Sequence, residues 1–366
     1  MIELFERYPD LEPHLPYRQL GRLPTPLDCH PGRDLGISCE HLLIKRDDQS
    51  GAAYGGNKVR KLEFLLADAI RQDCQGVITF GTAGSNHALA TAVYARQCDL
   101  ICYSMLSPQP VSSAVRKNLL AGYGIGNRLM GYESYEDSVA GARALLKEAS
   151  ERGVRLYRVR GGGSSPLGCI GFVNAALELR RQLDEQDLPP PDVIYVSLGT
   201  MGTVTGLMIG LQAAGIDCPV VAVRVVAEEV ANEPRYRVLY RETSELLCGG
   251  DAGFPVTGES IREPDVRHEN FGPGYGHYTE EGMRAVRFAR DALGIGLEGT
   301  YTGKTFAALM KDLEGEKLQG KSVLFWNTYN SMPLPEIDGL LDYQALPPFF
   351  HGFFEQPLQD LDPEAR

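Results

Sequence analysis

The sequence predicts an α/β fold made of two open, twisted, mostly parallel sheets flanked by helices, with a ligand bound between two lobes. Strand-like segments alternate with helices of about 10 to 15 residues, which is the pattern of βαβ units. Several strands are nearly continuous apolar runs, as expected where helices cover both faces of a parallel sheet. Glycine accounts for 41 of the 366 residues and is concentrated in a few loops.

A first set of strand and helix units lies in the N-terminal half. A short strand at residues 43–46 precedes the segment GGNK, which opens an amphipathic helix with Leu62, Leu65, Leu66 and Ile70 at helical spacing. Strands expected at residues 77–80, 99–106 and 128–132 each lead into a helix. We expect these units to form a smaller inserted lobe over residues 61–171.

A second set of units builds the larger lobe, which we expect to comprise residues 1–60 and 172–366. The glycine loop at residues 161–165 leads into a long helix, and the proline run at residues 189–191 ends it. Apolar strands are expected at residues 193–196, 219–226 and 322–327. The tail after Ala345 is first aromatic and then acidic, and we expect it to drape over the body of the protein.

Charge and composition exclude several classes of function. Lys and Arg total 36 against 48 Asp and Glu, which gives a net charge of −12. Nucleic-acid binding is therefore not expected, because it depends on basic patches. No membrane partner is expected either, since no apolar run reaches the ~18 residues of a spanning helix. The opening MIELFERYPDLEPH is acidic where a signal peptide is basic, which favours a cytoplasmic protein.

The segment VIYVSLGTMGTVTGL places a glycine turn between a buried strand and a helix. Backbone N–H groups and the helix dipole make the turn Gly199–Thr203 a candidate anion site, and the Thr200 and Thr203 hydroxyls add donors. The spacing is not the G-x-G-x-x-G of dinucleotide-binding folds. The alternative is a turn that needs glycine for its geometry alone.

Lys58 follows two glycines at the start of a predicted helix. A cation is disfavoured by the dipole at this end of a helix, so the neutral amine is favoured. A neutral lysine amine is what a covalent nucleophile toward an aldehyde requires. The alternative is a solvated lysine without a chemical role.

The segment GTAGSNH at residues 81–87 is a second polar turn before a helix. The same dipole argument allows it to bind a carboxylate, whereas the alternative is simple helix capping by Ser85 or Asn86.

Other chemistries lack their motifs. The segment GTYTGKT resembles a nucleotide-binding loop, but the required first glycine is Glu298. Neither Ser85 nor Ser164 lies in the G-x-S-x-G of serine hydrolases. The seven histidines form no HxxH or HExxH spacing, so no metal site is expected.

Together these segments resemble the 1-aminocyclopropane-1-carboxylate deaminase and D-cysteine desulfhydrase family of pyridoxal 5'-phosphate (PLP) enzymes, which has the tryptophan synthase β-like fold type II. The segment GGNKVRKLEFLLADA carries most of the resemblance. The other matching blocks run in order along residues 23–330: LPTPL, IKRDD, GSNH, GGSSPLGCIGFVNAALEL, the turn at residues 199–203, GPGYG and YTGK.

The resemblance implies a role for each matching residue. Lys58 would bind the cofactor covalently and move the α-proton, and Thr328 would face the pyridine nitrogen. Asn86 would contact the ring hydroxyl, Ser85 would receive the substrate carboxylate, and Tyr275 and Tyr301 would flank the ring. The full set is catalytic Lys58, Ser85 and Tyr301; cofactor-binding Lys58, Asn86, Gly199, Thr200, Met201, Gly202, Thr203 and Thr328; and substrate-binding Ser85, Asn86, His87, Tyr275 and Tyr301.

The residue after Tyr301 distinguishes the branches of this family. The deaminase branch has an acid there, which would keep the pyridine nitrogen protonated, whereas this chain has Thr302. We therefore expect α,β-elimination from a small amino acid, releasing sulfide or a similar group with pyruvate and ammonia. The alternatives are a cyclopropane-acid deaminase, a β-replacement enzyme, or a PLP-binding protein without turnover. The last of these would be favoured by Ala88 and Tyr329, where the chain departs from the family pattern. The resemblance also implies a homodimer.

Overall fold

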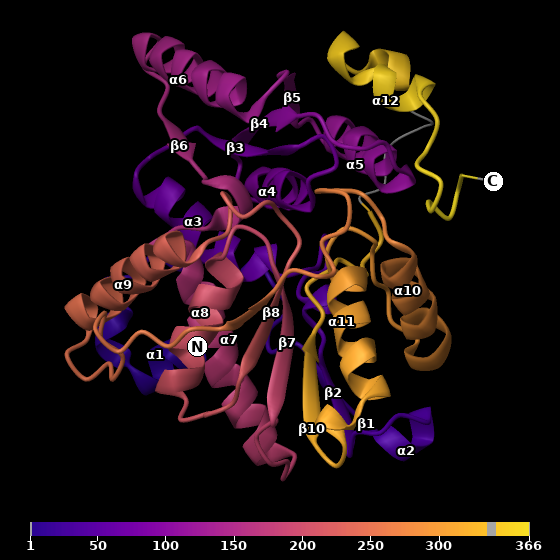
Figure 1. Ribbon diagram of the computed structural model, residues 1–366. Helices are drawn as coiled ribbons and strands as arrows, with labels where there is room; N and C mark the ends of the chain where they lie inside the picture. Colours follow the sequence, from indigo (N-terminus) through magenta and orange to yellow (C-terminus); the bar gives the residue numbers. More distant parts are fainter. Residues whose placement is uncertain (1, 335–341, 366) are drawn as a thin grey trace.

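The computed structural model describes residues 2–334 and 342–365 and contains two separate sheets (Figure 1). The larger sheet has the order β1-β2-β10-β7-β8-β9 and the smaller has the order β5-β4-β3-β6. Only the β1–β2 pair is antiparallel among the described strands; every other pairing is parallel. The predicted fold class is therefore confirmed.

The larger sheet consists of β1 (Leu27–Pro31), β2 (His41–Lys45), β7 (Val193–Leu198), β8 (Val220–Arg224), β9 (Asp265–Arg267) and β10 (Ser322–Trp326). The smaller sheet consists of β3 (Gly76–Thr82), β4 (Ile101–Ser107), β5 (Arg128–Gly131) and β6 (Leu156–Arg158). All seven strands expected from the sequence are present. The short edge strands β1, β6 and β9 were not expected. The smaller sheet falls within residues 61–171, although those lobe boundaries stay a prediction.

The helices are α1 (Glu3–Arg7), α2 (Gly32–Leu35), α3 (Lys58–Arg71), α4 (Asn86–Gln97), α5 (Ser113–Gly124), α6 (Tyr135–Glu151), α7 (Pro166–Glu185), α8 (Gly202–Ala213), α9 (Glu233–Gly250), α10 (Glu280–Leu293), α11 (Thr302–Glu314) and α12 (Gly352–Glu355). None of the helices among the described residues has the length and apolar character needed to cross a membrane.

Side chains that alternate along the central strands bury both faces of the larger sheet. Ile194 and Val196 of β7 pack in one core with α7 and α8, whereas Val193 and Tyr195 pack in another with α10 and α11. This arrangement explains the continuous apolar run of β7, because neither face of the strand meets water. The smaller sheet is covered in the same way, by α3 and α4 on one face and α6 on the other.

The ends of the central strands place two glycine turns at one crevice. β7 ends at Leu198 and α8 begins at Gly202, while β3 ends at Thr82 and α4 begins at Asn86. Ligands of open parallel sheets bind where the carboxyl ends of strands meet helix N-termini. The fold thus brings together two turns that lie more than 100 residues apart in the chain.

A fully buried cluster of charges holds the start of α3 in place. The Arg60 guanidinium donates two hydrogen bonds of 2.9 Å to the Glu178 carboxylate on α7 and three of 2.7 to 3.0 Å to Asp47. Lys45, at the end of β2, donates to Glu178 Oε1 at 2.5 Å, and the Trp326 indole N–H donates to Asp47 Oδ2 at 2.8 Å. Each of these five side chains is at most 2% exposed. The two cations and two carboxylates balance, which allows the cluster to remain charged in the interior.

We predict that Glu178→Ala lowers the free energy of unfolding by about 3 to 5 kcal/mol, because it leaves two buried cations without their shared partner. The control is Asp184→Ala, which removes an exposed partner of Arg180 on the same helix and should cost at most about 1 kcal/mol. Denaturant titration measures both. Equal losses in the two variants would contradict a dominant role for the cluster.

The stabilisation from Glu178 also depends on pH. Burial alone would raise the pKa of Glu178, but Arg60 and Lys45 together lower it to about 2. The carboxylate is therefore stabilising above the unfolded-state pKa of about 4.3. We expect the difference in unfolding free energy between wild type and Glu178→Ala to narrow as the pH falls from about 4.3 toward 2.

Candidate active site

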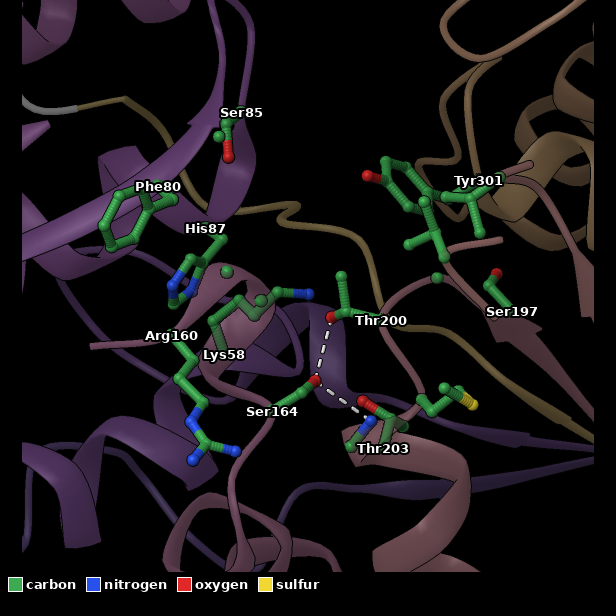
Figure 2. A pocket seen from close by; sticks show the side chains of 18 of the residues that line it. Lys58, Phe80, Ser85, His87, Arg160, Ser164, Ser197, Thr200, Thr203 and Tyr301 are labelled. Carbon is green, nitrogen blue, oxygen red and sulfur yellow. Dashed lines mark hydrogen bonds between the residues drawn. The ribbon is translucent and has the colours of Figure 1, made fainter. Parts of the chain in front are cut away.

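One cavity of about 970 Å³ opens at the crevice between the two sheets. Figure 2 shows Ser85 and Tyr301 on opposite sides of it, with the Lys58 amine directed toward Thr200. The structure brings together every site residue expected from the sequence, although their individual roles stay predictions. The lining includes all twelve: Lys58, Ser85, Asn86, His87, Gly199, Thr200, Met201, Gly202, Thr203, Tyr275, Tyr301 and Thr328.

The turn at residues 199–203 forms a cradle of hydrogen-bond donors. Met201 has φ +70° and turns the chain into α8, which begins at Gly202. The Gly202 N–H donates to Ser164 Oγ at 3.0 Å, and the Ser164 and Thr200 hydroxyls lie 2.8 Å apart (Figure 2). A Cβ atom on Gly202 would lie 2.7 Å from Ser164 Oγ, so the turn requires glycine at this point. The geometry matches an anion site at a helix N-terminus.

Lys61 adds a positive charge beside this cradle and was not considered in the sequence analysis. Its amine donates to the Gly162 carbonyl at 3.0 Å, and a Cβ atom on Gly202 would lie 3.0 Å from it. Burial lowers the pKa of Lys61 to about 8, so the amine is still mainly protonated at neutral pH. The sequence could have indicated that Lys61 lies near the site, because Lys58 and Lys61 are three residues apart and share one helix face.

Lys58 is the first residue of α3, and its amine lines the cavity. It donates to Asn57 Oδ1 at 2.8 Å, and Asn57 Nδ2 donates to Thr203 Oγ1 at 2.9 Å, which connects the amine to the cradle. Burial and the nearby charge of Lys61 hold the pKa of Lys58 well below its usual value, and the carboxylate of Glu298 opposes them only in part. The neutral, nucleophilic form of the amine is therefore favoured far more than in an exposed lysine.

The turn before α4 combines capping with a directed amide. Ser85 is the N-cap and accepts a hydrogen bond from the Ala88 N–H at 3.2 Å, so the capping alternative holds for this residue, whose side chain also lines the cavity. Asn86 Oδ1 accepts from Asn118 Nδ2 at 3.0 Å and from the Tyr54 hydroxyl at 3.3 Å. Because its oxygen already has two donors, Asn86 is oriented to offer its amide N–H groups to other partners.

His87 is 4% exposed and lies beside Lys58 and Arg160 (Figure 2). Its Nε2 lies 2.9 Å from Thr79 Oγ1, whereas its Nδ1 has no partner among the described residues. Burial, together with the positive charge of Lys61, holds the pKa of His87 well below 6.5. The ring is therefore neutral, so a contact from His87 to a substrate carboxylate would be a hydrogen bond rather than an ion pair.

Two tyrosines meet on the far side of the cavity. The hydroxyls of Tyr275 and Tyr301 lie 2.7 Å apart, and their rings are T-shaped with centroids separated by 6.0 Å. Burial raises the pKa of both phenols above the usual value of 10. Both hydroxyls are therefore protonated at neutral pH and can donate protons or hydrogen bonds into the cavity.

A carboxylate that the sequence analysis passed over also lines this side. Glu298 accepts from the backbone N–H groups of Tyr301 at 2.7 Å, Thr302 at 3.0 Å and Thr300 at 2.8 Å, which fixes it at the start of α11. The fully buried Thr302 hydroxyl accepts from the Glu298 N–H at 3.0 Å. The sequence could have indicated this position for Glu298, because it lies three residues before the tyrosine that opens a helix and acids often stabilise helix N-termini.

The depressed pKa of Lys58 predicts an unusual pH profile for acylation. An ordinary lysine amine reacts faster with rising pH up to about 10, because its neutral fraction grows. Because the pKa of Lys58 is held well below its usual value, we expect the rate of its acylation by acetic anhydride to level off at a lower pH than that of an exposed lysine. Peptide mass spectrometry gives the rate, with the exposed Lys311 as internal reference. A Lys58 rate that rises in parallel with the reference would contradict the burial argument.

Comparison with known proteins agrees with this arrangement. The family model described as "Pyridoxal-phosphate dependent enzyme" matches residues 19–328. A putative 1-aminocyclopropane-1-carboxylate deaminase of Pyrococcus abyssi is 33% identical over 313 residues, covering 83% of this chain and 88% of that protein. A D-cysteine desulfhydrase of Salmonella newport is 31% identical over 323 residues, covering 86% of this chain and 93% of that protein.

Solved structures show the same fold. The crystal structure of an ACC (1-aminocyclopropane-1-carboxylate) deaminase homologue superposes with a TM-score of 0.75 at 29% identity, covering 89% of this chain and 94% of that one. The processed form of threonine deaminase isoform 2 from Solanum lycopersicum shares the fold with a TM-score of 0.60 at 15% identity, covering 96% of this chain and 93% of that one. This chain therefore belongs to the family of pyridoxal-phosphate-dependent enzymes and is a PLP-dependent lyase of fold type II.

Proposed function

We propose that the protein catalyses α,β-elimination from a small amino acid with a good β-leaving group, as the name D-cysteine desulfhydrase describes for its relative. With cysteine, the overall reaction consumes one water and releases hydrogen sulfide, pyruvate and ammonia. The observation that carries this proposal is that one cavity is lined by the Lys58 amine, whose neutral form is favoured, and by the protonated phenols of Tyr275 and Tyr301. A base and an acid on opposite sides of a substrate are what elimination requires.

The residues present fit PLP. The helix N-terminus at Gly202 and the hydroxyls of Ser164, Thr200 and Thr203 would hold its phosphate, with Lys61 supplying the countercharge. A Cβ atom on Gly202 would crowd Ser164 Oγ and the Lys61 amine, so glycine at this position lets both groups lie beside the turn. When bound, PLP supplies an aldehyde that binds an amine covalently and a ring that withdraws electrons from the substrate α-carbon.

The residues of this chain would then bind the substrate, remove its α-proton and protonate the leaving group. Ser85 and the free N–H groups at the start of α4 would hold the substrate carboxylate. The Lys58 amine would take the proton from the α-carbon, since its neutral form is favoured and it is directed into the cavity. Tyr275 or Tyr301 would give a proton to the departing sulfur, and the 2.7 Å contact between the two hydroxyls lets one replenish the other.

Thr302 favours elimination over ring opening. Its hydroxyl is buried and paired with the Glu298 backbone, so it places no charge in the cavity where the deaminase branch has an acid. Thr328 would then meet the pyridine nitrogen as a neutral hydroxyl, and the ring would remain a weaker electron sink. A weaker sink suits the loss of a good leaving group better than the opening of a cyclopropane.

A cyclopropane-acid deaminase is the second candidate. The Glu298 carboxylate lines the same cavity and is the observation that favours it, since an acid near the ring would strengthen the electron sink. Against it, the Glu298 oxygens already accept hydrogen bonds from three backbone N–H groups. Three of its roughly four acceptor sites are thereby occupied, which leaves the carboxylate little capacity to bond a ring nitrogen.

We also propose that the enzyme acts in the cytoplasm as a homodimer. All eight cysteines are free in the structure, which suits a reducing compartment. The dimer is proposed from the family resemblance.

Product analysis separates the candidate reactions. We expect D- or L-cysteine to yield equal amounts of sulfide and pyruvate, and 1-aminocyclopropane-1-carboxylate to yield no 2-oxobutyrate. The reverse pattern would establish the deaminase instead, and dependence on a second nucleophilic substrate would indicate β-replacement. The remaining alternative is a PLP-binding protein without turnover. NMR can follow the exchange of the α-proton of small amino acids in heavy water, and a protein that exchanges none of them has no turnover.

The role of Lys58 is tested separately from the choice of substrate. We expect Lys58→Ala to lose the visible absorption band of covalently bound PLP and more than about 10³-fold of kcat, since both the attachment point and the base are removed. Lys311→Ala, an exposed lysine on α11, is the control and should retain the band. A Lys58→Ala protein that keeps the band would place the covalent attachment elsewhere.

A further inference from the structure

Tyr275 lies on a segment that cannot fix its own shape. Residues 271–278 connect β9 to α10 without helix or strand, and two glycines of this segment, Gly272 and Gly276, have φ of +72° and +78°. Such a segment has many accessible conformations and few internal contacts. The position of the Tyr275 hydroxyl, 2.7 Å from that of Tyr301, must therefore be set by neighbouring elements.

The first anchor comes from α11. Lys304 is fully buried, and its amine donates to the Phe271 carbonyl at 2.6 Å and lies 5.6 Å from the centre of the Phe271 ring. Burial of this amine near a helix N-terminus is unfavourable, so the contact has to compensate. Lys304 and Tyr301 are three residues apart on one helix face, so the same helix holds the start of the segment and meets its tyrosine.

The second anchor comes from the C-terminal tail. Gln359 Oε1 accepts from the Tyr278 N–H at 2.7 Å, and Gln359 Nε2 donates to the Gly276 carbonyl at 3.2 Å. One side chain thus binds the backbone at Gly276, the residue that follows Tyr275, and again at Tyr278. The Gln359 N–H donates to the Val111 carbonyl at 3.1 Å, just before α5 of the smaller sheet's layer.

The tail itself is fixed on α5 (Figure 1). Phe350 and Phe353 pack in one core with Val115 and Leu119 of α5. Asp362 is 3% exposed and accepts from the backbone N–H of Ser113, the first residue of α5, at 2.7 Å. The expectation that the tail drapes over the body is confirmed, and the tail lies beyond residue 328, where the family match ends.

We propose that residues 342–365 act as a strap that joins the two sheet layers and positions Tyr275 in the active site through Gln359. Gln359 is not part of the cavity lining and its side chain bonds backbone groups, so it is a positioning residue rather than a catalytic one. The strap fixes the turn that follows Tyr275, and Lys304 fixes the residue at its start. The consequence for turnover rests on the proposed function, whereas the consequence for the order of the segment does not.

The test compares Gln359→Leu with Gln356→Leu in the full-length PLP-loaded enzyme. The two positions lie in the same tail, and Gln356 is exposed, so the second variant controls for the change in chemistry. We expect amide hydrogen exchange of residues 271–278 to become roughly tenfold faster only in Gln359→Leu. We expect kcat with the best substrate to fall about tenfold while KM changes less than about twofold, because a proton donor is misplaced without loss of binding groups.

A conservative variant separates positioning from failure to fold. Gln359→Glu keeps the acceptor for the Tyr278 N–H but loses the donor to the Gly276 carbonyl, so its exchange rate and kcat should lie between those of wild type and Gln359→Leu. The visible band of bound PLP should be unchanged in every variant, since none of them alters the cradle or Lys58.

The outcomes distinguish the two proposals. If Gln359→Leu exchanges and turns over as Gln356→Leu does, the strap is overturned. If wild type releases no 2-oxo acid from any amino acid, the proposed function fails, and the exchange comparison still decides the strap. If Gln359→Leu and Gln359→Glu lose the PLP band or their cooperative unfolding, the tail is a general stabiliser and the positioning role is rejected.

Discussion

The geometry of the active site depends on the buried ion cluster at the start of α3. Arg60 lies two residues after Lys58, and its contacts with Glu178 and Asp47 bind α3 to α7 and to the segment after β2. Trp326 joins the same cluster from the end of β10, just before Thr328. Because a buried charge without its partner is strongly unfavourable, the cluster tolerates few alternative arrangements. Lys58, the helices packed behind the turn at residues 199–203, and Thr328 are thereby held relative to one another.

The same electrostatic reasoning explains the protonation states inside the cavity. Burial and neighbouring positive charge lower the pKa of Lys58 and of His87 and so favour their neutral forms, while burial raises the pKa of Tyr275 and of Tyr301 and keeps both protonated. Lys61 retains most of its charge beside the turn that would hold the phosphate. The cavity therefore combines an amine whose neutral form is favoured, two protonated phenols, and a cation beside a helix N-terminus, although the protein as a whole carries a net charge of −12.

Much of the fold could be read from periodicity, and the site from glycine turns and motif order. All seven predicted strands are present, and those covered on both faces leave the clearest pattern. The edge strands β1, β6 and β9 have three to five residues and leave none. Arg60, Lys61 and Glu298 were missed for a different reason: a charged residue on a helix or turn has the same sequence signature whether it is solvated or buried.

The sequence by itself determined the local structure: where strands end, which turns need glycine, and which lysine begins a helix without a favourable dipole. These properties depend on neighbours within a few residues, so a linear pattern records them. Only the tertiary structure decided which strand ends face each other, which charges are buried together, and that Gln359 binds backbone 83 residues away at Gly276. Contacts over such distances arise from packing and desolvation, which follow no repeat along the chain.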